Sequence, residues 1–323
     1  MKFPFRRFRY FVVRRTLIAF ERFFALFPIG FINAAMRICF RLLFPLIYLL
    51  PSLYRPLMRN ISIVYGRRRP LRERRALAKR VLERLFIIPF EIFYYVHPRN
   101  HKDVVKNFRI RGIEHLEDAF AKGRGVIGIG AHQSNFLLMV VRLEMSGIPF
   151  RVVLKYPHND FIRARYDYHR KQFHVNAIDA DNETRAAIQT LKSLKKNMMV
   201  FMVVDERKKR GGILVPFFGK EALTTPGPAI LSLRTGAPLV PIFMRSDRGH
   251  AYLIEIFPEI PVESTGDAKR DTYAITEKIN KTIESYILNH PDEWAWVNDR
   301  WEIKEKYLKK IKPRSIHTPG SIV

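Results

Sequence analysis

A histidine near the middle of the chain stands between an apolar run and a helical pattern. Residues 126–129 (Val-Ile-Gly-Ile) are apolar with a β-branched bias, which predicts a short buried strand. His132 follows in a turn, and a helix is expected over about 135–146, capped by Ser134. Loops at the carboxyl ends of strands converge on the crevice where α/β proteins hold reactive groups. His132 is therefore a candidate general base, and the positive helix N-terminus after it predicts a neutral imidazole. The alternative is that His132 only ties down a turn.

The stretches on both sides of this histidine alternate between strand and helix patterns, after a long helix expected at 71–95. The last two predicted strands, 238–245 and 251–257, are close enough in sequence to pair as a hairpin. This alternation predicts an α/β domain with a central mixed sheet flanked by helices. The other expected strands are 108–112, 150–154, 175–178 and 198–204, and the other expected helices are 116–121, 159–173, 184–195 and 228–235.

The first 65 residues combine many basic side chains with aromatic and aliphatic ones. Two apolar stretches, 23–36 and 42–54, are interrupted by prolines and separated by Arg37 and Arg41. Neither stretch reaches the roughly 20 apolar residues that a spanning helix needs. Such a composition is typical of a segment lying in the membrane interface, and a tilted or re-entrant single span is the alternative. The chain is therefore divided into a membrane-anchoring segment (1–65), an α/β domain (66–302) and a basic tail (303–323).

The formal net charge of +27 indicates a polyanionic partner, which could be nucleic acid, an anionic membrane surface or an acidic acceptor molecule. The chain carries no RNA-binding or zinc-finger signature, and its basic residues lie beside apolar runs. Both observations argue against nucleic acid and favour a membrane surface. The single cysteine, Cys39, excludes an internal disulfide framework, and the scattered histidines predict no structural metal site.

A second group of signals lies between residues 217 and 245. It contains the segments Phe217-Phe218-Gly219, Gly227-Pro228-Ala229 and Arg234-Thr235-Gly236-Ala237-Pro238, and it ends at Arg245. An acidic residue, Asp205, closes the preceding strand, and Trp296 and Arg300 follow near the C-terminus. With these features, the chain resembles the late acyltransferases of lipid A biosynthesis, within the lysophospholipid acyltransferase superfamily, over roughly residues 60–302.

This resemblance implies a glycerolphosphate acyltransferase-like fold and a place on the cytoplasmic face of a bacterial inner membrane. It implies transfer of a fatty acyl chain from a thioester, on acyl carrier protein or CoA, to a hydroxyl. The acceptor would be an anionic membrane lipid: a lipid A precursor-like glycolipid or a lysophospholipid. The thioester carries its own leaving group, so no cofactor or metal is expected. Acyl carrier protein is acidic, and a basic rim would steer it to the site.

The family's catalytic motif is a histidine followed after four residues by Asp or Glu, and this chain departs from it. His132 and Asn135 are in register with the motif, but Leu137 replaces the carboxylate. In the first interpretation, Asp205 orients His132 and the enzyme is active, with Glu144 as a less favoured partner. In the second, His132 works slowly without a partner. In the third, the chain is a catalytically impaired relative that binds lipid or an acyl carrier.

Several further residues are predicted to bind substrate. Arginines near strand ends fit bidentate contacts with phosphate groups on the acceptor, although each could equally be a solvated surface charge. The two phenylalanines before Gly219 could form a wall of the acyl pocket or plug the core. Main-chain N–H groups of the turn at His132 and of the following helix start could stabilise an oxyanion. The predicted substrate-binding residues are Asn135, Arg170, Arg207, Phe217, Phe218, Gly219 and Arg245.

Overall fold

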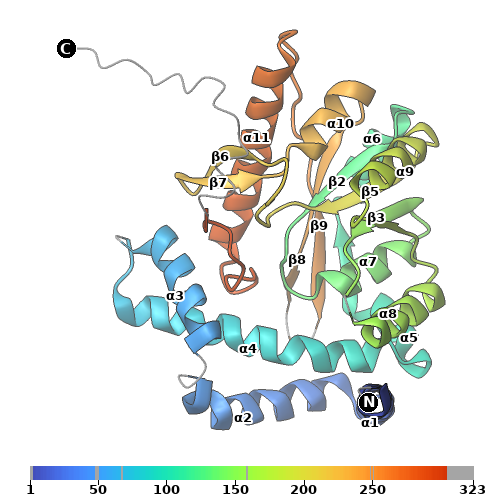
Figure 1. The fold of residues 1–323 in the computed structure, drawn as a ribbon, viewed down its shortest axis with the longest axis vertical. Coiled ribbons are helices and arrows are strands. Elements are labelled where there is room, and N and C mark those ends of the chain that lie inside the picture. Colours follow the sequence, from blue (N-terminus) through green and yellow to red (C-terminus); the bar gives the residue numbers. More distant parts are fainter. Residues whose placement is uncertain are drawn as a thin grey trace.

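The computed structural model describes residues 3–47, 51–66, 68–157, 159–247, 249 and 251–303. The predicted basic tail, apart from Ile303, lies outside the described residues. The described chain forms an α/β domain whose central sheet is flanked by helices, with the N-terminal helices along one side (Figure 1).

The central sheet has seven strands in the order β1-β9-β8-β2-β5-β3-β4. Strands β8, β2, β5, β3 and β4 run parallel to one another, whereas β9 is antiparallel to β8 and parallel to β1. The predicted mixed sheet is therefore confirmed, including the hairpin near residue 250. The strands are β1 Phe108–Arg111, β2 Val126–Gly130, β3 Phe150–Leu154, β4 Ala177–Asp179, β5 Met199–Val203, β8 Leu239–Ser246 and β9 Tyr252–Ile256. A separate antiparallel pair is formed by β6 Ile213–Phe217 and β7 Lys220–Thr224.

Helices cover both faces of the sheet because its strands alternate their side chains between two apolar layers. Ile127 and Ile129 of β2 pack in one layer with residues of α9 (Glu183–Lys195), α10 (Gly227–Thr235) and α11 (Ala268–Asn289). Val126 packs in the other layer with residues of α6 (Ile113–Ala121) and α7 (Phe136–Glu144). The remaining elements are η1 Pro98–Asn100, α5 His101–Asn107 and α8 Asp160–Gln172.

The glycines of β2 are needed for packing. A Cβ atom built on Gly130 would lie 2.3 Å from Cζ of Phe201, whose ring from β5 covers this part of the strand. Gly128 is also closely approached by Phe201 and by the sulfur of Met199. Any side chain on Gly130 would displace the ring, so its small size keeps β2 and β5 in register.

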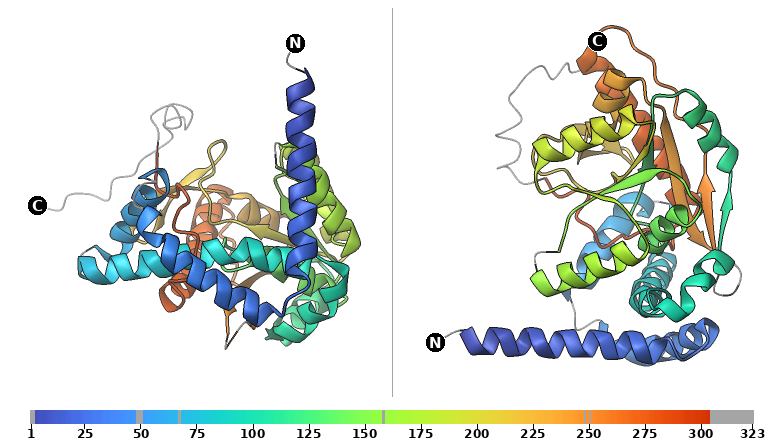
Figure 2. Two further views of the ribbon diagram at one scale, coloured as in Figure 1. Left: turned by 90° about the horizontal axis from the view of Figure 1, so that it is seen from below. Right: turned by 90° about the vertical axis from the view of Figure 1, so that its right-hand side faces the viewer.

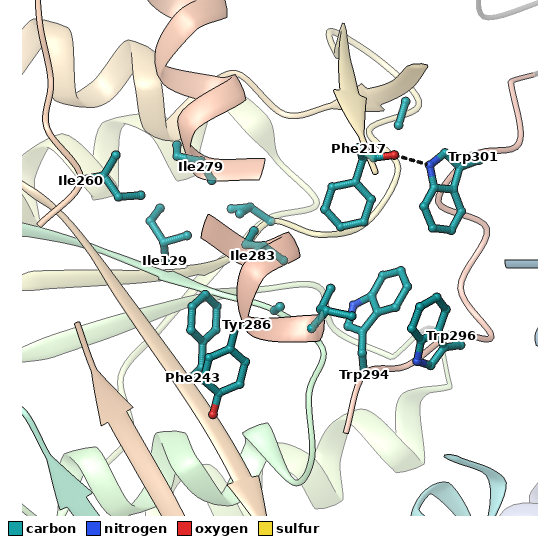
Figure 3. Close-up of a cluster of buried hydrophobic side chains, with 14 of the residues drawn as sticks. Ile129, Phe217, Phe243, Ile260, Ile279, Ile283, Tyr286, Trp294, Trp296 and Trp301 are labelled. Atoms are coloured by element: carbon teal, nitrogen blue, oxygen red, sulfur yellow. Dashed lines mark hydrogen bonds between the residues drawn. The ribbon is translucent and has the colours of Figure 1, made fainter. Parts of the chain in front are cut away.

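Helix α11 and the segment after it complete the first apolar layer. Figure 3 shows Ile279, Ile283 and Tyr286 of α11 facing Ile129 and Phe243 of the sheet. The tryptophans of the C-terminal segment gather around Phe217 at the end of β6, where Trp301 Nε1 donates to the Phe217 carbonyl at 3.0 Å (Figure 3). The sequence interpretation had assigned no element to residues 268–289, so α11 is a finding of the structure.

The N-terminal region forms α1 Phe3–Phe24, α2 Ile29–Ile47 and α3 Pro51–Tyr65, which pack against α4 Leu71–Tyr95. Helix α4 spans the predicted range. Helix α2 runs continuously through Arg37 and Arg41, so most of the first apolar stretch and the start of the second belong to one helix. The helical hydrogen bonds of the backbone continue there, and the two arginines lie on the partly exposed surface of one amphipathic helix.

One surface of α2 faces α4 and the other faces outward. Ile32 and Phe40 are buried, whereas Phe31, Ile38 and Leu42 are exposed. Among the described residues, one helical stretch, Ile29–Leu46, is long and apolar enough to cross a membrane by length and composition. Figure 2 shows α1 running out beyond the rest of the domain from the start of α2. The exposed large apolar side chains of this region are Phe11, Val12, Val13, Phe20, Phe23, Leu26, Phe31, Ile38, Leu42, Leu43 and Leu46.

Candidate active site

The register of two neighbouring strands brings His132 and Asp205 together. Gly130, the last residue of β2, pairs with Val203, the last residue of β5. His132 and Asp205 each follow this pair by two residues, so both lie at the carboxyl edge of the sheet. The imidazole Nδ1 of His132 is 2.8 Å from Asp205 Oδ1, and the His132 main-chain N–H donates to Oδ2 at 2.9 Å.

Asp205 is held as a carboxylate by three donors. Its side chain is 1% exposed, and Trp294 Nε1 donates to Oδ2 at 2.7 Å in addition to the two contacts from His132. Burial by itself would raise the pKa of this carboxyl group. The charge of His132 and the hydrogen bonds from His132 and Trp294 outweigh burial, so the pKa lies below its usual value of 3.8. Trp294 is thus a residue of the site that the sequence interpretation missed.

His132 is correspondingly more basic than an ordinary histidine. Burial alone would lower its pKa, but the charge and hydrogen bond of Asp205 and the charge of Glu206 raise it to about 9. The predicted neutral imidazole is therefore wrong at neutral pH, because two carboxylates outweigh the partial charge of a helix end. Glu206 Oε1 lies 3.5 Å from the outer ring nitrogen, Nε2. With Nδ1 donating to Asp205, Nε2 is the nitrogen that can exchange a proton with a substrate.

The turn after His132 is fixed by contacts with the C-terminal segment and α4. Ser134 has a φ of 48°, a left-handed conformation unusual for a residue with a side chain, and its N–H donates to the Glu293 carbonyl at 2.7 Å. Its hydroxyl accepts from Arg84 at 3.3 Å. Ser134 is therefore not the helix cap: Asn135 occupies that position, without a side-chain capping bond.

This geometry narrows the predicted oxyanion site. The N–H of His132 donates to Asp205, that of Gln133 to the Ala131 carbonyl at 2.8 Å, and that of Ser134 to Glu293. The three N–H groups of the turn are thus engaged within the protein. Of the predicted oxyanion donors, only the main-chain N–H groups in the first turn of α7 remain compatible with the structure. Leu137, at the motif position of the missing carboxylate, lies half-buried in that turn.

A buried carboxylate on α4 supports the same turn. Glu91 is 0% exposed and accepts from Asn135 Nδ2 at 3.3 Å and from Asn33 Nδ2 at 3.0 Å, and Tyr252 donates its hydroxyl to it. The predicted substrate-binding residue Asn135 is itself buried, with its amide directed to Glu91. Sequence reasoning missed Glu91, although an isolated acid in the apolar half of a long helix was a usable signal.

The predicted arginines are each held by groups of the protein. Arg207, two residues beyond Asp205, pairs with Glu302 at 2.9 Å. Arg245, near the end of β8, pairs with Glu255 at 3.1 Å. Arg170 pairs with Asp167 at 3.2 Å on α8, and it also donates to the Val175 carbonyl. Of these three arginines, Arg207 lies closest in sequence to Asp205.

The two predicted phenylalanines have different environments. Phe217 is fully buried between Trp294 and Trp301, so its side chain plugs the core. Phe218 and Gly219 form the tight turn between β6 and β7, with φ of 53° and 72°. They line a cavity of about 530 Å³ between α3 and α11, together with Ser62, Ile63, Val64, Gly66, Arg68, Glu284 and Leu288.

A mainly apolar groove of about 340 Å³ is lined in part by Val203 and Val204, the two residues before Asp205. It runs between α9 and α10 across the ends of β3 and β5, and Val204 belongs to its lining. Lys208 and Arg210 contribute positive charge to its lining, where Lys208 pairs with Glu183 at 2.5 Å. Its other lining residues include Val153, Ala186, Met202, Ile230 and Leu231. Within the described part of the chain, no cluster of three or more His, Cys, Asp or Glu side chains is placed to hold a metal ion.

Comparison with known proteins identifies the family. The family described as bacterial lipid A biosynthesis acyltransferase matches residues 2–303, nearly the whole chain. The chain belongs to this acyltransferase family. The resemblance drawn from the residues around 217–245 is thereby confirmed.

The relatives that this chain resembles are acyltransferases with different names. The chain is 24% identical to a phosphatidylinositol mannoside acyltransferase of Mycolicibacterium smegmatis over 203 residues, which cover 62% of this chain and 65% of that protein. It is 26% identical over 205 residues to a lipid A biosynthesis palmitoleoyltransferase of Escherichia coli K12, covering 62% and 63% of the two chains. It is 26% identical to the lauroyltransferase of the same organism, covering 60% and 61%. The matched regions thus span just under two thirds of these relatives, at low identity.

Proposed function

We propose that this protein is a membrane-associated O-acyltransferase with His132 as general base and Asp205 as its orienting carboxylate. The donor is an acyl thioester of acyl carrier protein or CoA, and the acceptor is a hydroxyl of a membrane glycolipid or lysophospholipid. The observation that carries the proposal is the 2.8 Å contact between His132 Nδ1 and the buried carboxylate of Asp205. This contact supplies what the family motif places five residues after the histidine, where this chain has Leu137.

The proposed mechanism assigns a different role to each of the two nitrogen atoms of the His132 imidazole. Asp205 accepts the Nδ1 proton and holds the ring so that Nε2 faces the substrate. Nε2 takes the proton of the acceptor hydroxyl as its oxygen attacks the thioester carbonyl. The tetrahedral intermediate then collapses, the C–S bond breaks, and the imidazolium returns the proton to the leaving thiolate. An ester and a free thiol result, and atoms and charges balance without a cofactor.

The apolar groove beside Asp205 suits the acyl chain of the donor. It is lined mainly by aliphatic side chains, among them Val204, the residue before Asp205 in the sequence. Lys208 and Arg210 suit the phosphate of a phosphopantetheine arm, which acyl carrier protein and CoA share. Arg207 remains a candidate for an acceptor phosphate because it follows Asp205 so closely. Of the other predicted substrate-binding residues, Asn135 and Phe217 are buried, and Phe218 and Gly219 form the turn between β6 and β7.

The N-terminal helices suit attachment to the cytoplasmic face of a bacterial inner membrane. Apolar side chains such as Phe31, Ile38 and Leu42 are exposed on the side of α2 that faces away from α4. Arg37 and Arg41 lie on the same helix and would reach anionic headgroups. Helix α2 packs along α4 instead of leaving the domain, which favours an interfacial position over a spanning one.

The experiment that tests this function is acyl transfer by the full chain in detergent micelles. Acyl carrier protein and CoA thioesters of several chain lengths would be offered with a lipid A precursor and lysophospholipids, and products identified by mass spectrometry. We expect turnover in the wild type and its loss in His132→Ala. The matched control, His115→Ala, changes a histidine on α6, near the opposite edge of the sheet, and should retain activity.

The alternative function is lipid or carrier binding without catalysis, and the presence of Leu137 is the observation that favours it. If the wild type shows no turnover and the Leu137→Asp variant does, the fold is intact and the site has lost its activity through the change at residue 137. If neither the wild type nor any variant shows turnover but vesicle binding is retained, the protein is a binding protein and the catalytic proposal is refuted.

A further inference from the structure

A polar cavity of about 330 Å³ lies at the catalytic edge of the sheet, between α2, α4, the β8–β9 turn and the loop after α11. Figure 1 shows β8 and β9 extending toward α4, with α2 on the far side of that helix. Strand β8 is the neighbour of β2, which carries His132 beyond its end. The cavity is lined by Asn33, Arg37, Arg80, Glu83, Arg84, Ile87, Glu91, Ser246, Asp247, Gly249, Ala251, Tyr252, Asp292 and Glu293.

The lining carries an unusual number of unsatisfied polar atoms. Within the described part of the chain, five of its buried side-chain atoms have no hydrogen-bond partner. Most buried polar groups in proteins are hydrogen-bonded, because burying an unpaired one costs its hydration without a compensating contact. A cluster of unpaired atoms around one cavity therefore points to a polar occupant. The atoms are Asn33 Oδ1, Arg84 Nε, Ser246 Oγ, Asp292 Oδ1 and Glu293 Oε2.

The three arginines of the lining are already paired with carboxylates of the protein. Arg80 pairs with Asp292 at 2.7 Å, Arg37 lies 3.7 Å from Glu83, and Arg84 lies 3.7 Å from Glu293. Five carboxylates stand against three guanidinium groups in all. Among the described residues of the lining, a phosphate would meet more carboxylates than guanidinium groups, and each arginine there has a carboxylate beside it. The occupant that fits is uncharged.

The unpaired atoms also define what the occupant must offer. Arg84 Nε is a donor, and Asn33 Oδ1, Asp292 Oδ1 and Glu293 Oε2 are acceptors. The gap between Arg84 Nε and Glu293 Oε2 is 3.7 Å, too long for a direct hydrogen bond. A hydroxyl group beside both atoms could accept from the arginine and donate to the carboxylate. Several hydroxyls on one small ring would satisfy the whole set, as a sugar or another polyol does.

The same residues connect the cavity to the catalytic turn. Arg84 donates to the Ser134 hydroxyl, and Glu91 accepts from Asn135, so two residues of the lining hold the segment just after His132. On the other side, Asn33 belongs to α2, whose outer surface is apolar. A lipid headgroup entering between α2 and the β8–β9 turn would therefore lie between the membrane-facing helix and the base.

We infer that this cavity binds the uncharged sugar or polyol headgroup of the acceptor lipid. The role of this lipid as the acyl acceptor rests on the proposed function, whereas the existence of the binding site does not. It differs from the sequence prediction, which placed a phosphorylated headgroup against arginines. Phosphate groups of an acceptor would lie outside this cavity, toward Arg207 or the membrane surface.

The test measures binding and transfer separately, with the full chain in a detergent that contains no sugar. Isothermal titration would compare monoglucosyl diacylglycerol with the same lipid phosphorylated on its sugar. We expect the uncharged lipid to bind more tightly. Ser246→Ala should weaken its binding about five- to tenfold, since one hydrogen bond to the ligand is lost. Because Ser246 Oγ has no partner among the described residues, the same change should leave the melting temperature unaltered.

Two further variants complete the design. Glu293→Gln retains an oxygen for the Ser246 main-chain N–H but replaces the acceptor that faces Arg84, so it should also weaken binding. Ser146→Ala is the matched control, because this exposed serine lies beyond the far end of α7. Equal binding of the two lipids, or unchanged binding in both cavity variants, would overturn the inference and leave ordered water as the occupant.

Thioester hydrolysis, measured in the same samples, distinguishes failure of the proposed function from failure of this inference. Hydrolysis of the donor thioester by water depends on His132 but needs no headgroup. If the cavity variants lose transfer to the glycolipid but retain hydrolysis, both proposals are supported. If the wild type shows neither transfer nor hydrolysis but still binds the uncharged lipid through Ser246, the inference stands and the acyltransferase proposal fails.

Discussion

The substitution Asp205→Asn removes the charge that makes His132 basic while retaining the size of the side chain. An asparagine has one acceptor oxygen, whereas Asp205 accepts from the His132 main chain, the His132 ring and Trp294. The ring is then no longer held with Nδ1 protonated. In serine proteases, loss of the orienting acid costs about 10⁴-fold in rate, and we expect a similar loss here.

The pH dependence makes this prediction specific. The pKa of His132 is about 9 in the wild type, and the base works only when it is neutral. At pH 7, about one wild-type molecule in 100 therefore carries the neutral ring. Without Asp205, the largest contribution that raises the pKa is lost, while burial still lowers it and Glu206 still raises it, so a larger fraction of the variant carries the neutral ring at pH 7. The variant should therefore be less impaired at pH 7 than at pH 10, where the wild-type base is mostly neutral and the loss should reach about 10⁴-fold.

The assay is acyl transfer in micelles from pH 5.5 to 10, with spontaneous thioester hydrolysis subtracted at each pH. The acid limb of the wild-type profile should lie near pH 9, and that of Asp205→Asn should lie at lower pH, because the largest contribution that raises the pKa of His132 is lost. Asp103→Asn, which changes an aspartate on α5 that pairs with Tyr94, is the control for a general effect of the substitution. An unmoved acid limb, or a variant as fast as the wild type at pH 10, would refute the role of Asp205.

Three further predictions concern other parts of the molecule. Glu206→Gln removes a carboxylate 3.5 Å from His132 Nε2, so the acid limb should shift to lower pH with little change in the maximal rate; an unshifted limb would exclude its influence on the base. Phe217→Ala leaves a cavity among buried tryptophans and should lower the free energy of urea unfolding by about 3–5 kcal/mol, whereas a loss below 1 kcal/mol would contradict its place in the core. Replacing Ile38 and Leu42 by serine should weaken co-sedimentation with anionic vesicles without lowering the melting temperature, because both are exposed; unchanged binding would refute the membrane surface on α2.

Much of the fold could be predicted from local pattern. The strands at 150–154 and the helix at 71–95 have the predicted bounds, since apolar runs with clear ends specify them. The pairing of residues 238–245 with 251–257 followed from their closeness in the chain. The contact between His132 and Asp205 could be anticipated because both follow apolar strands that a parallel sheet brings to one edge. Their catalytic roles stay predictions.

Other features depend on contacts between residues far apart in the sequence. Ser134 has the composition of a helix cap, but Glu293, nearly 160 residues away, accepts its main-chain N–H and fixes a different conformation. Phe217 lies in a segment typical of the family, yet its burial is decided by Trp294 and Trp301. The pKa of His132 depends on two carboxylates whose positions only the folded sheet specifies. Local sequence patterns do not contain this information.

The central claim is that His132 and Asp205 form a working acyl-transfer site although residue 137 is a leucine. The most direct test is the initial rate of acyl transfer by purified wild type, His132→Ala and Leu137→Asp under identical conditions. The account predicts turnover in the wild type, loss of at least about 10³-fold in His132→Ala, and no requirement for a carboxylate at 137. Equal rates in the wild type and His132→Ala, or activity found only in Leu137→Asp, would contradict it.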